Sequence, residues 1–123
     1  MRVPASASPH IVPVPLSDPA GVDPEEAFVA ALSSCHMLWF LSIAAERGFV
    51  VDSYTDEAEG VLEPDSEGRL AMTRVTLRPR IEFSGPAPIG KEVEAIHQEA
   101  HRKCFIANSV KTTLTVEPAV PSP

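Results

Sequence analysis

The stretch that most constrains the fold runs from Asp23 to Gly48, DPEEAFVAALSSCHMLWFLSIAAERG. It predicts one long helix, because Asp23 is a preferred N-cap residue, Pro24 falls at the first helical position and Glu26 falls where a capping box places its acid. Gly48 supplies the left-handed residue on which helices commonly end. At about 1.5 Å per residue the helix would be about 36 Å long, so the rest of a small domain must pack around it.

Cys35 lies in the middle of this predicted helix, on its apolar stripe. The stripe consists of residues that recur at helical spacing, namely Phe28, Ala31, Leu32, Cys35, Leu38, Trp39, Ser42 and Ile43. Ser33, Ser34 and His36 surround the cysteine with polar groups, which a thiol that only fills a core does not need. A lone buried cysteine is more often a small hydrophobe than a reactive sulfur, so Cys35 alone does not establish a function.

The composition indicates one globular domain with an acidic surface. The chain has 123 residues, of which 44% are hydrophobic and 22% are charged, enough for one modest core. Its net charge of −7 argues against nucleic acid or an anionic membrane as the main partner. We find no signal-peptide core and expect no membrane span, so we expect a cytoplasmic protein. In that reducing compartment two cysteines are more often catalytic, redox-sensing or metal-binding than a structural disulfide.

The segments on either side of the long helix have a different character. Residues 1–20 contain five prolines and predict an extended arm over the domain surface, with a short edge strand at 11–14. Residues 49–62 and 74–83 predict the two arms of a β-hairpin, because a cluster of turn-forming residues at 64–68 lies between them. A proline inside the second arm indicates an edge strand or a bulge.

A second helix is predicted from residue 89 or 90 to Cys104. Its buried face would consist of Ile89, Val93, Ile96, Ala100 and Cys104. A last strand is predicted over 110–117, followed by a loose tail at 119–123. Each of two helix faces thus presents one cysteine to the same core. Helices packed about 8–10 Å apart can bring two such thiols within the Cα range of a disulfide, so Cys35 and Cys104 form a candidate redox dithiol.

A zinc site is the competing interpretation of the same region. His97, His101 and Cys104 lie four and three positions apart on the second helix, and Cys35 with His36 could complete a tetrahedral set. The sequence contains neither a CxxC pair nor an HExxH motif, and histidines at such positions usually lie on a solvated helix flank. These observations favour the dithiol over the metal.

Two segments resemble the OsmC/Ohr family, the osmotically inducible and organic hydroperoxide resistance proteins. The helix DPEEAFVAALSSCHMLWFLSIAAERGF is similar to the family's first-cysteine helix, in which Pro-Glu precedes a run of small residues ending in Cys. AHRKCFIANSVKTTLTV is similar to the family's second-cysteine segment, which leads into a terminal strand. The resemblance covers residues 21–118. It implies an α+β fold with two antiparallel sheets around two central helices, in an intertwined homodimer with its active sites at the interface.

The resemblance also implies an enzyme, a thiol-dependent peroxidase that reduces organic hydroperoxides. By position Cys35 matches the peroxidatic cysteine, Cys104 the resolving cysteine, and Glu25 the glutamate that positions a thiolate-holding arginine. No metal or bound cofactor is implied, and a lipoyl-type dithiol would regenerate the reduced protein. The alternative from a different class is a non-catalytic dimeric thiol redox sensor or binding protein on the same fold.

Two features of this chain depart from the family pattern. The family's arginine comes from strands that precede the long helix, whereas here Arg2, in the proline-rich arm, is the sole arginine before that helix. Glu25 and Cys35 would lie about 15 Å apart along one helix axis, so they cannot touch within one chain. We therefore expect either a bridging group between them or a Glu25 that serves the partner subunit's cysteine.

Overall fold

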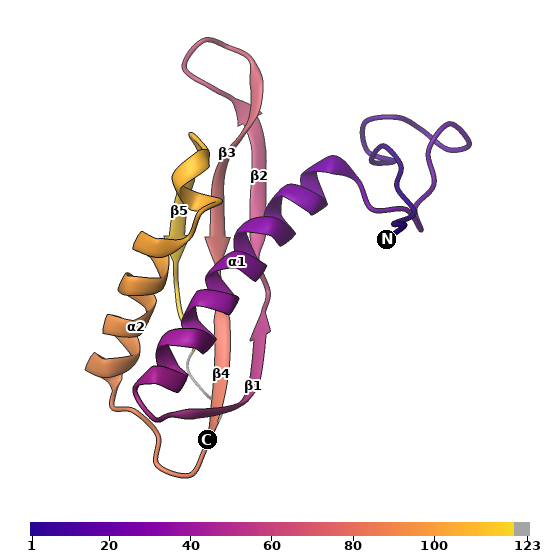
Figure 1. Ribbon diagram of the computed structural model, residues 1–123. Coiled ribbons are helices and arrows are strands. Elements are labelled where there is room, and N and C mark those ends of the chain that lie inside the picture. The colour runs from indigo at the N-terminus through magenta and orange to yellow at the C-terminus, as the bar shows by residue number, and fades with distance from the viewer. Residues whose placement is uncertain (120–123) are drawn as a thin grey trace.

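The computed structural model describes residues 1–119, in which two helices and five strands follow an irregular N-terminal segment. The elements are α1 (Pro24–Glu46), β1 (Val50–Asp56), β2 (Glu59–Pro64), β3 (Leu70–Leu77), β4 (Pro79–Ser84), α2 (Gly90–Lys103), a 3-10 turn (Ala107–Ser109) and β5 (Thr113–Val116). β1 pairs with β4, and β3 lies between β2 and β5. Figure 1 shows α1 crossing the strands diagonally with α2 beside it. The predicted α+β class, with two helices and two sheets, is confirmed; the β3–β5 pair is parallel, so the larger sheet is mixed.

α1 begins and ends where its capping residues predict. The Asp23 carboxylate accepts a hydrogen bond from the Glu26 backbone N–H at 2.8 Å, and Gly48 adopts a left-handed φ of 81°. The buried residues of α1 are Leu32, His36, Phe40, Ile43 and Ala44. The buried face of α1 therefore differs from the predicted stripe. Leu38, which was predicted on that stripe, is 62% exposed, because most of the residues that meet the sheets and α2 are spaced four apart along the helix.

Two apolar clusters hold α1 on the strands. The first joins Phe40, Ile43, Ala44, Ile81, Ile96 and Ala100, so that α1, β4 and α2 share it. The second joins Leu32 with Val75 and Leu77 of β3. Val75, Leu77 and Ile81 are all buried, as expected from the alternation of apolar and polar residues along 74–83. The two clusters fix the height and rotation of α1, and hence the position of the residues midway along it.

The predicted hairpin is divided into two separate strand pairs. A break after Asp56 separates β1 from β2, and a break at Arg78 separates β3 from β4. Asp56 accounts for the second break, because its carboxylate accepts the Arg78 backbone N–H at 2.7 Å, in place of a strand partner. Pro79, predicted to mark an edge or a bulge, is the first residue of β4. Prolines are tolerated there because the first residue of a strand need not donate to the ladder.

The N-terminal arm closes on itself instead of forming the predicted edge strand at 11–14. Ser6 N–H donates to Val22 O at 3.1 Å, and Val22 N–H donates to Pro4 O at 3.0 Å. Both backbone groups of Val12 are also bonded inside the arm, to Ser8 O and to the Ser17 hydroxyl. The 11–14 segment therefore has turns, not strand pairing. Figure 1 shows this segment as a looped body beyond the start of α1.

The last strand is shorter than predicted. The first residue of the tail, Ala119, is hydrogen-bonded to β4. β5 covers four residues, because Thr112 turns its hydroxyl onto Met72 O at 2.7 Å instead of extending the ladder. Ala119 N–H donates to Pro79 O at 2.9 Å. The rest of the tail predicted as loose, 120–123, lies outside the described residues. α1 is long and apolar enough to cross a membrane by length and composition alone, contrary to the expectation from sequence, but a core helix passes the same test.

Candidate redox site

Cys35 and Cys104 lie beside each other where the middle of α1 meets the end of α2. Cys35 is half-buried, whereas Cys104 is 0% exposed, and both are free thiols. The Cys35 side chain is near enough to Cys104 to raise the pKa of the Cys104 thiol. The structure thus brings together the two sulfurs that the sequence placed on separate helices. Two neighbouring thiols can form a disulfide after a small adjustment of their side chains.

The local backbone after α2 explains the position of Cys104. Cys104 is the C-cap of α2, with an extended conformation of φ −67° and ψ 110° that turns the chain away from the helix axis. The chain then folds back, with Asn108 N–H donating to Cys104 O at 3.1 Å. This turn aims the Ala107 backbone N–H at the Cys104 sulfur, 3.4 Å away. Cys104 is therefore held by backbone geometry and not only by side-chain packing.

The surroundings of Cys104 favour its protonated form. Burial raises the pKa of the Cys104 thiol, and the neighbouring Cys35 thiol raises the pKa further. The Ala107 and Ile106 backbone N–H groups act in the opposite direction, but the net effect is an increase. Because the thiolate is the reactive form of cysteine, Cys104 is poorly suited to make a first attack on a substrate.

An apolar rim lies next to the two thiols. Leu38, one turn along α1 from Cys35, is 62% exposed, and Phe105, which follows Cys104, is 68% exposed. The Phe105 ring meets the Trp39 ring edge to face, with centroids 5.6 Å apart, and the Lys103 ammonium lies 5.4 Å from the Trp39 centroid. The approach to the dithiol is therefore apolar with one cation beside it, which suits a substrate carrying an alkyl or aryl group.

His36 and His97 form a buried pair that the sequence analysis missed. His36 Nε2 and His97 Nδ1 are 2.9 Å apart, and the rings stack at 5.2 Å. His36 is 0% and His97 is 4% exposed, so neither lies on a solvated flank. Burial lowers the pKa of each histidine to about 4, so both are neutral near pH 7. The sequence did contain a signal for the burial of His36. It lies four residues from both Leu32 and Phe40, so the three side chains share one face of the helix.

The structure does not assemble the zinc set considered from the sequence. His101 is exposed, while His36 and His97 bond to each other. Within residues 1–119 no group of three or more His, Cys, Asp or Glu side chains is arranged to hold a metal ion. The zinc interpretation therefore has no support from the arrangement of these side chains.

Glu25 does not join the two thiols. It lies in the first turn of α1 and lines a groove with Ser33, Asp56 and Glu59. Its buried Oε2 atom has no hydrogen-bond partner among residues 1–119. The Asp56 carboxylate in the same groove is satisfied by the Ser33 hydroxyl at 2.6 Å. Glu25 thus brings to this groove a buried acceptor without a partner among residues 1–119.

Two arginines that could act as an activating cation, Arg47 and Arg78, already pair with carboxylates. Arg47 pairs with Glu99 at 3.0 Å. Arg78 pairs with Glu59 at 3.0 Å and approaches Glu117 at 3.8 Å. Arg2 lies exposed in the N-terminal arm. The salt bridges of Arg47 and Arg78 give both guanidinium groups a structural role, so the structure provides no argument for assigning either to the thiols.

Comparison with known proteins identifies the family of this chain. The family model of OsmC-like protein matches residues 17–119. A solved OsmC-like protein of unknown function from Vibrio cholerae is 57% identical, covers 97% of this chain and 78% of its own, and superposes with a TM-score of 0.95. No protein of curated function matches the sequence.

Two more distant structures share the fold. The organic hydroperoxide resistance protein OhrB of Bacillus subtilis is 20% identical, covers 80% of this chain and 71% of its own, and has a TM-score of 0.68. An organic hydroperoxide resistance protein from Elizabethkingia anophelis is 16% identical, covers 100% of this chain and 82% of its own, and has a TM-score of 0.73. Taken with the family match over most of the chain, these likenesses show that the protein belongs to the OsmC-like family.

Proposed function

We propose that this protein is a thiol-dependent peroxidase that reduces organic hydroperoxides through Cys35 and Cys104. The observation that carries the proposal is that two free thiols from separate helices lie near enough to influence each other, one half-buried and one fully buried. Membership of the OsmC-like family supports it, and two structural neighbours carry the name organic hydroperoxide resistance protein.

The reaction begins at Cys35, the more accessible sulfur. Its thiolate attacks the outer oxygen of ROOH, the O–O bond breaks, and the alkoxide takes up a proton and leaves as ROH. Cys35 is then a sulfenic acid. The Cys104 sulfur attacks the Cys35 sulfur, the S–S bond forms, and the hydroxyl leaves as water with the proton that Cys104 gives up. A dithiol reductant of the lipoyl type restores both thiols by two exchange steps and is itself oxidised to a disulfide.

The substrate follows from the rim beside the thiols. Leu38 and Phe105 expose apolar surface there, and a hydroperoxide with an alkyl or aryl group can cover that surface, whereas hydrogen peroxide cannot. Each buried methylene contributes about 0.8 kcal/mol of binding, so a chain of several carbons raises affinity by orders of magnitude. We expect organic hydroperoxides to be the better substrates.

The assembly and the role of Glu25 belong to the same proposal. We infer an intertwined homodimer in which Glu25 acts as a positioning residue toward the partner subunit's cysteine. Two observations support this inference: Glu25 cannot reach Cys35 along its own helix, and its buried Oε2 lacks a partner within the described chain. We also propose a cytoplasmic location, since the reductants that recycle such a dithiol are maintained in that compartment.

The proposal is tested by following peroxide consumption with dihydrolipoamide as reductant. Cumene hydroperoxide and hydrogen peroxide are the two substrates, and Cys35→Ser, Cys104→Ser and the exposed control Ser34→Ala are the variants. We expect multiple turnovers with cumene hydroperoxide, none with Cys35→Ser, and an unchanged rate with Ser34→Ala. In the absence of dihydrolipoamide, Cys104→Ser should consume one equivalent of peroxide and then stop, with a sulfenic acid that dimedone traps.

Other outcomes of the same assay favour the competing functions. Slow, stoichiometric oxidation of both thiols without turnover by any dithiol would contradict the peroxidase and favour a redox sensor. Equimolar zinc in the purified protein would favour a metal site if the zinc is absent from both Cys35→Ser and His101→Ala. A sedimentation measurement showing a monomer would contradict the dimer and the role given to Glu25, while leaving the chemistry of the two thiols open to the first test.

A further inference from the structure

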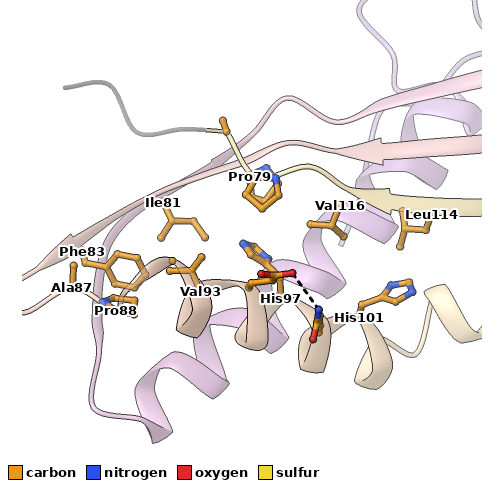
Figure 2. Close-up of a pocket in the computed structure, with 15 residues that line it drawn as sticks. Pro79, Ile81, Phe83, Ala87, Pro88, Val93, His97, His101, Leu114 and Val116 are labelled. Carbon is orange, nitrogen blue, oxygen red and sulfur yellow. Dashed lines mark hydrogen bonds between the residues drawn. The ribbon is translucent and has the colours of Figure 1, made fainter.

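A cavity of about 770 Å³ lies between α2 and the strands β4 and β5, away from the thiols. Its walls are mostly apolar side chains from these elements and the loop before α2, including Ile81, Phe83, Ala87, Val93, Leu114 and Val116. Neither cysteine lines it. Figure 2 shows the apolar side chains of the strands facing α2 across the cavity. Its size and lining are typical of a site for a small organic molecule.

His97 brings one buried polar atom to this cavity. The side chain is 4% exposed, lines the cavity, and has no hydrogen-bond partner for Nε2 among residues 1–119. The other polar wall residues lie along α2, where Gln98 already donates to Glu94 at 3.5 Å and His101 is exposed (Figure 2). A buried donor or acceptor without a partner costs about 1–3 kcal/mol. A ligand that bonds to Nε2 would recover part of that cost.

The chemistry of the histidine pair selects the ligand's polar group. His97 Nδ1 is bonded to His36 Nε2, so His97 Nε2 is a donor in one tautomer of the pair and an acceptor in the other. A hydroxyl group can both donate and accept, and therefore suits either tautomer. A carboxylate can only accept, would meet an uncharged ring, and would lie near the Glu94 carboxylate on the same wall. An ammonium would lose its hydration among apolar walls, and the Glu94 carboxylate, which is exposed to solvent, would offset only part of that cost.

We propose that this cavity is a binding site for an uncharged aliphatic or aromatic alcohol. The hydroxyl group bonds to His97 Nε2, and the apolar body lies between Val93 on α2 and the side chains of β4 and β5. The site is separate from the dithiol and needs no peroxidase activity, so it stands or falls independently of the proposed function.

The test is calorimetric titration of the whole protein near pH 7 with three ligands of equal chain length. The ligands are 1-octanol, octanoate and octylammonium. We expect 1-octanol to bind, and the two charged ligands to bind at least about ten-fold more weakly, because each must give up hydration on entering the cavity. Absence of octanol binding, or equal binding of all three, would overturn the proposal.

Variants separate the hydroxyl contact from general apolar binding. His97→Phe removes Nε2 and should weaken octanol binding about ten-fold, the value of one hydrogen bond to a buried partner. His10→Phe, exposed in the N-terminal arm and outside the cavity, is the control and should leave affinity unchanged. Ala87→Trp, in the exposed loop before α2, fills the cavity without touching the histidine pair and should abolish binding even if His97→Phe fails to fold. An Ala87→Trp protein that folds and binds octanol as before would refute the site.

Discussion

The buried histidine pair predicts a steep loss of stability in mild acid. His36 and His97 ordinarily titrate near 6.5, and burial lowers the pKa of each to about 4 in the folded protein. The nearby His101 lowers the pKa of His36 further, and the Asp56 carboxylate partly opposes this effect. Between pH 6.5 and about pH 4 the two histidines bind protons in the unfolded chain but not in the folded chain. The stabilisation is therefore complete above pH 6.5 and is lost as the pH falls toward 4.

The size of the effect follows from the difference between the two pKa values. At about pH 5 each histidine contributes a loss of about 2 kcal/mol in the free energy of unfolding relative to neutral pH. The pair together then loses about 4 kcal/mol, a large share of the roughly 5–15 kcal/mol that holds a domain of this kind folded. The two protonations also compound each other, because the ring atoms that face one another cannot both carry a proton without repulsion.

Urea unfolding followed by circular dichroism at a series of pH values measures this loss. The double variant His36→Phe/His97→Leu removes both titrating groups and should show a much flatter dependence on pH, whatever its stability at neutral pH. His10→Gln is the control, because His10 is exposed in the N-terminal arm and should leave the slope as it is. A wild-type free energy of unfolding that changes by less than about 1 kcal/mol between neutral pH and pH 5 would refute the reasoning.

Three further predictions concern packing, capping and substrate choice. Gly60→Ala should destabilise the protein by about 1–3 kcal/mol in urea unfolding, because a Cβ there would lie 2.7 Å from Cγ2 of the β-branched Val29 on α1, besides 2.5 Å from the flexible end of Met72; an unchanged midpoint would contradict the close approach of β2 to α1. Asp23→Ala should cost about 1 kcal/mol by loss of its bond to Glu26 N–H, and Asp23→Asn, which keeps a capping oxygen, should recover most of it in the same assay. Leu38→Asn should lower kcat/KM for cumene hydroperoxide several-fold while leaving hydrogen peroxide unaffected; an equal fall for both would argue against an apolar rim.

The features that the sequence predicted well are those set by neighbouring residues. The ends of α1 follow from Asp23 and Gly48, whose capping roles depend on a few adjacent backbone groups. The inward face of β3 and β4 follows from their alternation. The division of the hairpin was not predictable in this way, because Asp56 bonds to a backbone group 22 positions away. The His36–His97 pair spans 61 positions, and only the packing of α1 on α2 brings its two rings together.

The roles proposed for the two cysteines also depend on long-range packing and not on neighbouring residues. The sequence placed a thiol on each helix but could not rank them, since both fell on predicted buried faces. In the fold, Cys104 is 0% exposed with a raised pKa, while Cys35 is half-buried beside the exposed side chain of Leu38. Under the proposed mechanism a hydroperoxide would therefore meet Cys35 first, and the buried Cys104 thiol would attack the sulfenic acid. Reversed roles would need Cys104 to lose its proton and meet a substrate that the surrounding side chains keep away, so burial and the raised pKa support the order that the proposal adopts.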